Sequence, residues 1–294
     1  MRFNIRLYYQ PIYRNIYKNI LNIEEIFKMS TKNVFIMTCG GLGNQLFQIA
    51  FGFYLLQHDI SVYVPDIYKL TAYPGENRHT YWDTFPCPFY KIPKEDFPTD
   101  MKVLGDHEIS SYQNITSQNT QVYGHFQKYA FVEKTLPQIR KWLKSMNCQV
   151  EAEMRKIKYG ECVSLHVRRG DYVKMSHVHN LLSIHYYSDA LTHFDEQLPL
   201  VVFSNDIPWC REHFGMFNRE IHYVPDDIPD YVQLGMMSKI KYNIIANSTF
   251  SWWAAVLNEN RNKRVVSPKE WLCNSKYNLS RPEWIEISDK GVYF

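Results

Sequence analysis

The stretch Val34-Phe35-Ile36-Met37-Thr38-Cys39-Gly40-Gly41-Leu42-Gly43-Asn44-Gln45 joins an apolar run to a glycine-rich turn. A short apolar run bounded by a turn signal is typical of a buried strand, here at 34–38. The turn is followed by a helical pattern, with apolar residues at Leu46, Ile49, Ala50, Phe53 and Leu56. Strand, glycine turn and helix in this order predict the opening of an α/β domain.

The same alternation of apolar runs and amphipathic stretches continues along the chain. It predicts strands at 61–64, 121–124, 162–167, 200–204, 221–224, 242–246 and 264–267, and helices at 46–57, 131–158, 186–194, 231–237 and 251–258. Six prolines between positions 65 and 98 predict that residues 65–120 are irregular. Alternating strands and helices favour a mostly parallel sheet, with ligands at the carboxyl ends of its strands.

The predicted organisation is an N-terminal extension at residues 1–30, an α/β domain at 31–155 and a second α/β domain at 156–294. A chain of 294 residues is long enough for one large domain or for two of ordinary size. The boundary is placed near 150–160, where a charged helical stretch ends and a new series of strands and helices begins.

Composition excludes some classes of protein. The net charge of +3 argues against a dedicated nucleic-acid binder, which needs a clustered basic face. The six cysteines contain no CxxC pair, which argues against a zinc site or a dense disulfide framework. Reduced, partly buried thiols fit this spacing and favour a cytosolic compartment.

No apolar run approaches the ~20 residues that a membrane-spanning helix needs. Arg2, Arg6, Arg14 and Lys18 interrupt the first 28 residues, so no secretory signal is expected. This segment has two interpretations: a loosely ordered extension, which we favour, or a short amphipathic helix on a membrane surface. The expected location is cytoplasmic, with peripheral membrane contact through residues 1–28 under the second interpretation.

The strongest local feature is His166-Val167-Arg168-Arg169-Gly170-Asp171-Tyr172, which comes directly after a predicted strand. Two adjacent arginines at a strand end need a neutralising partner, and their forked guanidinium groups match a pyrophosphate. Charge-assisted hydrogen bonds of this kind contribute ~1.5–3 kcal/mol each. Asp171 can hold one guanidinium, and His166 can form a hydrogen bond or shuttle a proton. The alternative is a purely structural Arg–Asp pair.

Two further strand ends in the second half carry polar residues. Ser204-Asn205-Asp206 suits a contact with a nucleotide base or ribose, and equally a helix N-cap at Ser204 or Asn205. Asn247-Ser248-Thr249-Phe250-Ser251-Trp252-Trp253 opens a helix after the strand 242–246. Its hydroxyls beside helix N–H groups predict a phosphate cradle, although an ordinary N-cap has the same pattern.

The glycine turn alone is a weaker signal. It has neither the Lys-Ser/Thr ending of a P-loop nor the GxGxxG spacing of dinucleotide folds. Its backbone N–H groups can approach an anion or a sugar closely, and a tight turn that needs a positive φ is the alternative. The sequence has no Asp-x-Asp motif to hold a metal on a nucleotide-sugar pyrophosphate, so no metal or other cofactor is expected.

Ordered motifs between about residues 33 and 272 resemble those of one family. GGLGNQLFQIAFG, which begins at Gly40, is similar to its N-terminal motif, and Tyr123–Tyr129 to its G-x-x-Q-x-x-x-Y/F segment. HVRRGDY matches the HxRRxD motif shared by α-1,2-, α-1,6- and protein O-fucosyltransferases. Ser183–Ala190 is like the YYxxA helix, and FSND and ANSTFSWW resemble the donor-side motifs. The family is that of the α-1,2-fucosyltransferases, glycosyltransferase family 11.

The resemblance implies a GT-B-like fold, in which two Rossmann-like domains face a cleft and the second binds the donor. It implies inverting, metal-independent transfer of L-fucose from GDP-β-L-fucose to the 2-hydroxyl of a terminal galactose on a glycan acceptor. Arg168 would bind the β-phosphate and stabilise the leaving GDP, and Arg169 would support it. His166 and Asp171 would shape the loop, and both are candidates for a general base. The residues expected to bind GDP-fucose are Arg168, Arg169, Gly41, Gly43, Asn44, Gln45, Ser204, Asp206, Asn247, Ser248, Thr249, Phe250 and Ser251.

Some features depart from the family pattern. The extension at residues 1–30 is unusual, and residues 70–120, which should meet the acceptor, match no motif. Animal members carry a Golgi anchor that this sequence lacks, so a microbial or viral enzyme is expected. The alternatives are transfer of another GDP-sugar, another fucosyl linkage, and a glycan- or nucleotide-binding protein without catalysis.

Overall fold

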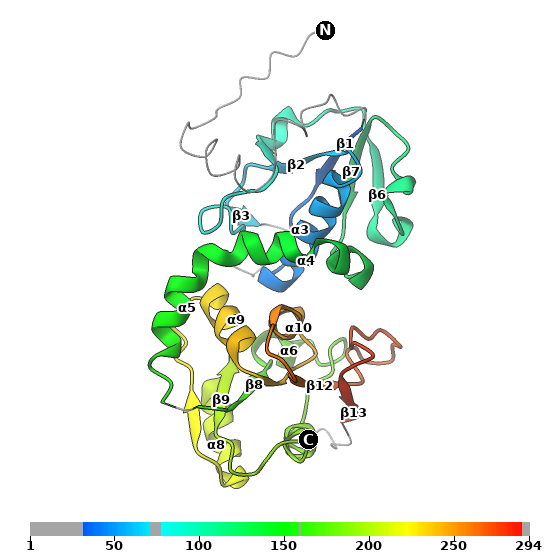
Figure 1. Cartoon of the computed structure of the whole chain (residues 1–294). Coiled ribbons are helices and arrows are strands. Elements are labelled where there is room, and N and C mark those ends of the chain that lie inside the picture. Colours follow the sequence, from blue (N-terminus) through cyan, green and yellow to red (C-terminus); the bar gives the residue numbers. More distant parts are fainter. Residues whose placement is uncertain (1–31, 71–77, 159, 290–294) are drawn as a thin grey trace. The chain divides into compact units, whose positions relative to one another are not determined.

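The computed structural model describes residues 32–70, 78–158 and 160–289 (Figure 1). The chain divides into two compact units between Lys144 and Ser145. Each unit contains one parallel sheet with helices packed on it, which confirms the predicted α/β class. The segment for which the sequence suggested membrane contact, residues 1–28, lies outside the described residues.

The first unit contains a five-stranded sheet in the order β5-β2-β1-β7-β6, and every pairing in it is parallel. The strands are β1 (Asn33–Ile36), β2 (Ser61–Pro65), β5 (Tyr90–Ile92), β6 (Lys102–Gly105) and β7 (Asn119–Tyr123). Helix α3 (Leu42–Leu56) follows the glycine turn, is buried along almost its whole length and packs on α4 (Tyr129–Trp142). The predicted strand, turn and helix are therefore confirmed.

Gly40 supplies the positive φ that a tight turn requires. Its φ is +77°, and a Cβ at this position would lie 2.6 Å from the Asn44 Nδ2 atom. A side chain there would be strained by the backbone and would displace Asn44. Gly41, by contrast, has an extended backbone and precedes the first helical residue of α3.

The prediction that residues 65–120 are irregular was wrong in part. Strands β5 and β6 from this region form the two edges of the sheet, and β3 (Lys69–Leu70) pairs with β4 (Arg78–His79) in a small antiparallel hairpin. These strands contain only two to four residues. Alternation of apolar and polar residues needs about four to eight positions to be recognised, so the signal is lost in such short strands.

The second unit contains a six-stranded sheet, again parallel throughout, in the order β10-β9-β8-β11-β12-β13. The strands are β8 (Val163–Val167), β9 (Leu200–Ser204), β10 (Ile221–Tyr223), β11 (Tyr242–Ile244), β12 (Arg264–Pro268) and β13 (Ile285–Ile287). Every residue of β8 and β9 is buried, as expected for central strands covered by helices on both faces. The sequence did not predict β13, which has three residues.

The helices of the second unit are α5 (Asn147–Met154), α6 (Gly170–Lys174), α7 (Ile184–Leu191), α8 (Ile207–Phe214), α9 (Asp230–Lys239) and α10 (Thr249–Leu257). The single helix predicted at 131–158 is interrupted by a 3-10 turn at Leu143–Met146. Beyond it α5 packs against α9, where a Cβ on Gly235 would come within 2.4 Å of Val150. Glycine at 235 therefore permits this close helix contact.

Trp252 and Trp253 of α10 are fully buried and belong to the core of the second unit. All six cysteines are free thiols, in agreement with the expectation from their spacing. In the described ranges, no helix has both the length and the apolar character needed to cross a bilayer.

Candidate active site

Arg168 directly follows β8 and forms an ion pair with Asp171 in the first turn of α6. The Arg168 Nη2 atom lies 2.6 Å from Asp171 Oδ1 and 2.7 Å from Oδ2, so one guanidinium nitrogen contacts both carboxylate oxygens. The guanidinium carbon also lies 5.2 Å from the ring centroid of Tyr172. A guanidinium has five N–H donors, so this pair orients Arg168 and leaves donors for an anion.

Arg169 is fixed by the neighbouring strand end instead. Its Nε atom lies 3.2 Å from Asp206 Oδ2, and its guanidinium carbon lies 4.2 Å from the ring centroid of Trp209. Its backbone N–H donates to Asn205 Oδ1 at 3.0 Å. The side chain of Arg169 is 16% exposed and that of Arg168 is 21% exposed. Arg169 therefore clamps the ends of β8 and β9 together.

The helix N-cap predicted at Ser204 or Asn205 is instead Asp206. Its Oδ1 atom accepts a hydrogen bond from the Trp209 backbone N–H at 3.2 Å. Ser204 Oγ accepts one from the Asp206 backbone N–H at 2.9 Å. One carboxylate thus caps α8 through one oxygen and holds Arg169 through the other. The sequence missed this double role because the partner arginine lies 37 positions earlier.

His166 is 5% exposed and lies on β8, two residues before Arg168. Burial, reinforced by the positive charge of Arg168, lowers the pKa of His166 to about 3. Its Nδ1 atom is buried and has no hydrogen-bond partner among the described residues. A group with this pKa is neutral at pH 7 and is too weak a base to accept a proton from a hydroxyl efficiently. This argues against the interpretation of His166 as a general base.

The amino end of α10 lies next to the arginine loop. Tyr172 donates its hydroxyl proton to the Asn247 carbonyl at 3.1 Å, and the His166 ring lies 5.5 Å from that of Phe250. Loops that follow β8, β9 and β11 are therefore joined at one edge of the sheet, as the strand-end argument predicts.

Not every polar residue of this segment is available to a ligand. Asn247 donates through Nδ2 to the carbonyls of Asn180 and Trp271, at 2.8 and 2.9 Å. Ser248 is the N-cap of α10, and Ser251 is fully buried with its hydroxyl directed at backbone carbonyls. Thr249 and Phe250 are half-buried at the helix start. The side chains of Asn247, Ser248 and Ser251, which the sequence assigned to a phosphate cradle, are therefore engaged in contacts within the protein.

The glycine turn belongs to the first unit. Gln45 is 1% exposed, and its Nε2 atom donates to the carbonyls of Gly40 at 2.9 Å and His79 at 2.8 Å. Gly43 is buried inside α3. Asn44 is half-buried, accepts a hydrogen bond from Gln127 at 2.9 Å and lies 3.4 Å from His125 Nε2. Of the residues predicted here, Gln45 therefore stabilises the turn through its hydrogen bonds. Asn44 belongs to a polar cluster with Gln127 and His125.

His125 and Asp106 complete this cluster, and neither was among the predicted site residues. Asp106 Oδ2 accepts hydrogen bonds from the backbone N–H groups of His125 and Phe126, at 3.1 and 3.4 Å. Gly124 has a φ of +128°, and a Cβ there would lie 2.6 Å from Asp106. Burial lowers the pKa of His125, while the Asp106 carboxylate opposes the shift. The motif at 123–129 contains His125, so the sequence could have indicated this residue. Asp106 lies in the region 70–120, which matches no motif of the family.

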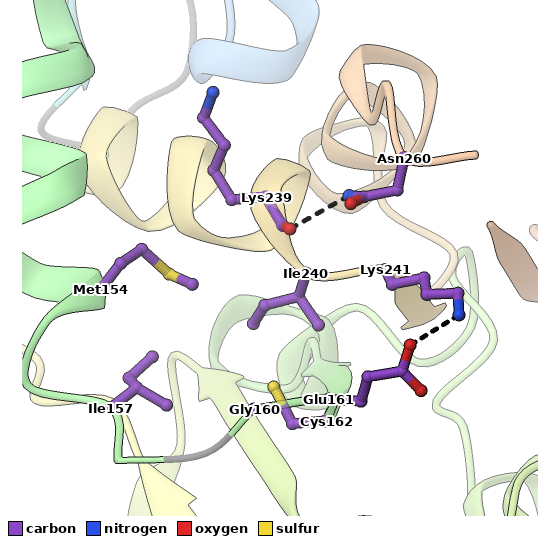
Figure 2. Close-up of a pocket in the computed structure, with 9 residues that line it drawn as sticks. All are labelled: Met154, Ile157, Gly160, Glu161, Cys162, Lys239, Ile240, Lys241 and Asn260. Atoms are coloured by element: carbon purple, nitrogen blue, oxygen red, sulfur yellow. Dashed lines mark hydrogen bonds and ion pairs between the residues drawn. The ribbon is translucent and has the colours of Figure 1, made fainter. Parts of the chain in front are cut away.

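A cavity of about 200 Å³ lies at the other edge of the second sheet, where β8 and β11 begin. Figure 2 shows Met154, Ile157 and Ile240 around it, with Lys241 paired to Glu161 at 2.7 Å. None of the predicted site residues lines this cavity. The polar strand ends, rather than this cavity, therefore form the candidate active site.

Two parallel α/β units of this kind define the GT-B class of glycosyltransferase folds. The structure of the NodZ α-1,6-fucosyltransferase from Bradyrhizobium has a TM-score of 0.51 and 11% identity, over 77% of this chain and 92% of that chain. A glycosyl transferase family 9 protein from Veillonella parvula has a TM-score of 0.50 and 8% identity, over 91% of this chain and 90% of that one. The predicted GT-B-like fold is therefore confirmed.

Residues 100–288, well over half of the sequence, match the family described as glycosyl transferase family 11, and the chain belongs to this family. The O-antigen biosynthesis glycosyltransferase WbnK of Escherichia coli is 39% identical over 134 residues, or 42% of this chain and 44% of that protein. An α-1,2-colitosyltransferase of Escherichia coli is 34% identical over 137 residues, or 42% of this chain and 47% of that protein. The matches span less than half the length of either relative.

Proposed function

We propose that this protein is an inverting glycosyltransferase that moves L-fucose from GDP-β-L-fucose to the 2-hydroxyl of a terminal galactose on a glycan, without a metal. The observation that carries the proposal is Arg168, held by Asp171 at the end of β8 beside the amino end of α10. An oriented arginine next to a helix N-terminus suits the pyrophosphate of a nucleotide sugar. Membership of family 11 supplies the reaction class.

In the proposed reaction, the bond between fucose C1 and the β-phosphate oxygen breaks, and its electron pair stays on GDP. Arg168 and the N–H groups of α10 stabilise the charge that develops on the leaving phosphate. The acceptor hydroxyl oxygen attacks C1 from the opposite face, which inverts the configuration. The hydroxyl proton passes to solvent water after C1 has gained oxocarbenium character, so a strong base is not required.

The test is incubation of the full chain with a panel of donors and galactose-terminated acceptors. The donors are GDP-fucose, GDP-mannose and a colitose donor, because one relative is an α-1,2-colitosyltransferase. NMR of the product reads the linkage, and release of GDP is measured with and without acceptor. An α-1,2-fucosyl product is expected. Preferred transfer of another sugar, another linkage, or GDP binding without any transfer would each overturn the proposal.

A further inference from the structure

We propose that Tyr68 and His79 form a platform on which a pyranose ring of the acceptor glycan stacks. The proposal rests on the proposed function, since it assigns the acceptor to a surface of the first unit. Tyr68 is 59% exposed, and its ring stacks on the His79 ring with centroids 5.2 Å apart and an angle of 21° between the ring planes. One face of the Tyr68 ring is therefore supported by His79.

A supported aromatic face suits the apolar side of a sugar. The C–H groups of a pyranose carry partial positive charge, and the face of an aromatic ring is negative. Because His79 already restrains the Tyr68 ring, less side-chain freedom is lost when a ligand binds. His79 is itself backed by the buried Tyr81, whose ring centroid lies 4.9 Å away.

The platform is tied to the carboxyl edge of the first sheet. Thr80 donates its backbone N–H to the Tyr68 carbonyl at 2.8 Å and its hydroxyl to the Ile67 carbonyl at 2.7 Å. Gln45 links the His79 carbonyl to that of Gly40 through one buried amide nitrogen. These contacts fix the platform relative to the glycine turn, which is the ligand edge of a parallel α/β sheet.

Polar groups beside the platform can form hydrogen bonds with the hydroxyl groups of a sugar. A Cβ on Gly41 would lie 3.3 Å from Arg78 Nη1, so the guanidinium lies against the backbone of the glycine turn. The neighbouring Asn44 belongs to the amide cluster at the same turn. Sugars bind through one stacked face and hydrogen bonds around the rim, and both are present here. Two rings offer far less area than the roughly 800 Å² per partner of a stable protein interface.

The same unit contains a matched control. His58 and Tyr112 also stack, with centroids 3.7 Å apart and planes at 12°. This pair lies just beyond the carboxyl end of α3, which begins at the glycine turn and ends at Leu56. Tyr112 is half-buried, so it offers a Tyr–His stack remote from the turn.

The experiment compares Tyr68→Ala, Tyr68→Trp and Tyr112→Ala in the full chain. Binding of the glycan panel, without donor, is measured by saturation-transfer NMR and titration, and GDP binding is measured separately. Tyr68→Ala should weaken glycan binding about tenfold, which corresponds to 1.4 kcal/mol, and should leave GDP binding unchanged. Tyr68→Trp should retain binding, and Tyr112→Ala should have little effect.

Three results would overturn the proposal: equal weakening by Tyr68→Ala and Tyr112→Ala, selective loss of GDP binding in Tyr68→Ala, or no glycan binding by the unmodified protein. The measurements of GDP binding and of glycan binding do not require that the protein transfers a sugar. A protein that binds glycans through Tyr68 but transfers no fucose would retain the platform and refute only the proposed reaction.

Discussion

The carboxyl edges of the two sheets have the same backbone plan and different side chains. In each, a central strand leads into a loop with a positive-φ glycine, Gly40 after β1 and Gly170 after β8. In the second unit two arginines between β8 and Gly170 form ion pairs, Arg168 with Asp171 and Arg169 with Asp206. In the first unit amide side chains hydrogen-bond to one another and to backbone carbonyls. A shared fold therefore provides two polar sheet edges that differ in the types of residue they carry.

The difference follows from what each group does with an incoming ligand. Guanidinium donors already fixed by carboxylates can exchange water for phosphate oxygens with little reorganisation, which favours an anion. Amides offer both donors and acceptors without net charge, which suits the hydroxyls of a sugar. We therefore expect variants at the charged edge to change GDP binding and turnover, and variants at the amide edge to change acceptor binding.

The largest effect is expected from Arg168→Ala. Removal of one preorganised donor at a developing negative charge reduces turnover by roughly 10²–10³-fold. The matched control is Arg211→Ala, because Arg211 is an exposed arginine of the second unit whose guanidinium also lies over a tyrosine, 4.4 Å from the Tyr223 ring centroid. Steady-state kinetics should show the loss only in the first variant, with unchanged circular dichroism. Near-normal turnover in Arg168→Ala would remove the charged edge from the reaction.

The two turn glycines allow a direct comparison of the edges. A Cβ on Gly170 would lie 2.1 Å from Asn205 Nδ2, and Asn205 accepts a hydrogen bond from the Arg169 backbone N–H. A Cβ on Gly40 would displace Asn44. Each alanine variant should lose about 1–3 kcal/mol in urea unfolding. Gly215→Ala is the control, since a Cβ there meets no described atom within 4 Å.

The functional readouts should divide between the two glycine variants. Gly170→Ala should weaken GDP binding, and Gly40→Ala should raise the acceptor KM. If both changes reduced the same readout to the same extent, the assignment of one ligand to each edge would be wrong.

The sequence predicted those strands and contacts of the two sheet edges that a pattern of neighbouring residues encodes. Long apolar runs followed by polar residues located β8, β9 and β11, and the motif at 166–172 located the ion pair of Arg168. The hydrogen bonds of Asp106 to the backbone at 125–126 span 19 or 20 positions. No local pattern encodes such a contact. The hydrogen bonds of the Ser251 hydroxyl to the Ala246 and Ser248 carbonyls also depend on packing, which residue type alone does not reveal.

Two histidines, the buried His166 and the half-buried His125, experience opposite local charges. Arg168 adds to the burial that lowers the pKa of His166 to about 3, whereas Asp106 opposes the burial that lowers the pKa of His125. Because the folded-state pKa of His166 lies below its unfolded value, its neutral form stabilises the fold fully above pH 6.5. That stability is lost as the pH falls from 6.5 towards 3, by about 1.4 kcal/mol per pH unit.

Urea unfolding at pH 7.5 and pH 5 should therefore show a smaller pH dependence in His166→Gln than in the unmodified protein, by about 2 kcal/mol. His177→Gln, at an exposed position of the same unit, is the control for the loss of an imidazole that is not buried. An identical loss of stability at pH 5 in His166→Gln and in the unmodified protein would show that His166 is already accessible to protons.

The smallest effect tests whether an added negative charge matters at the amide edge. Asn44→Asp retains an acceptor for Gln127 and places a negative charge near His125, since Asn44 Nδ2 lies 3.4 Å from His125 Nε2. A nearby carboxylate favours the protonated imidazole, so the pKa of His125 should rise in an NMR titration. Stability should change by less than about 1 kcal/mol, because Asn44 is half-buried and water screens the new charge. If the edge selects a neutral sugar, acceptor binding should weaken only modestly and GDP binding should stay the same. A fall in GDP affinity would instead mean that the charge on this edge influences the anion, and the division between the two edges would fail.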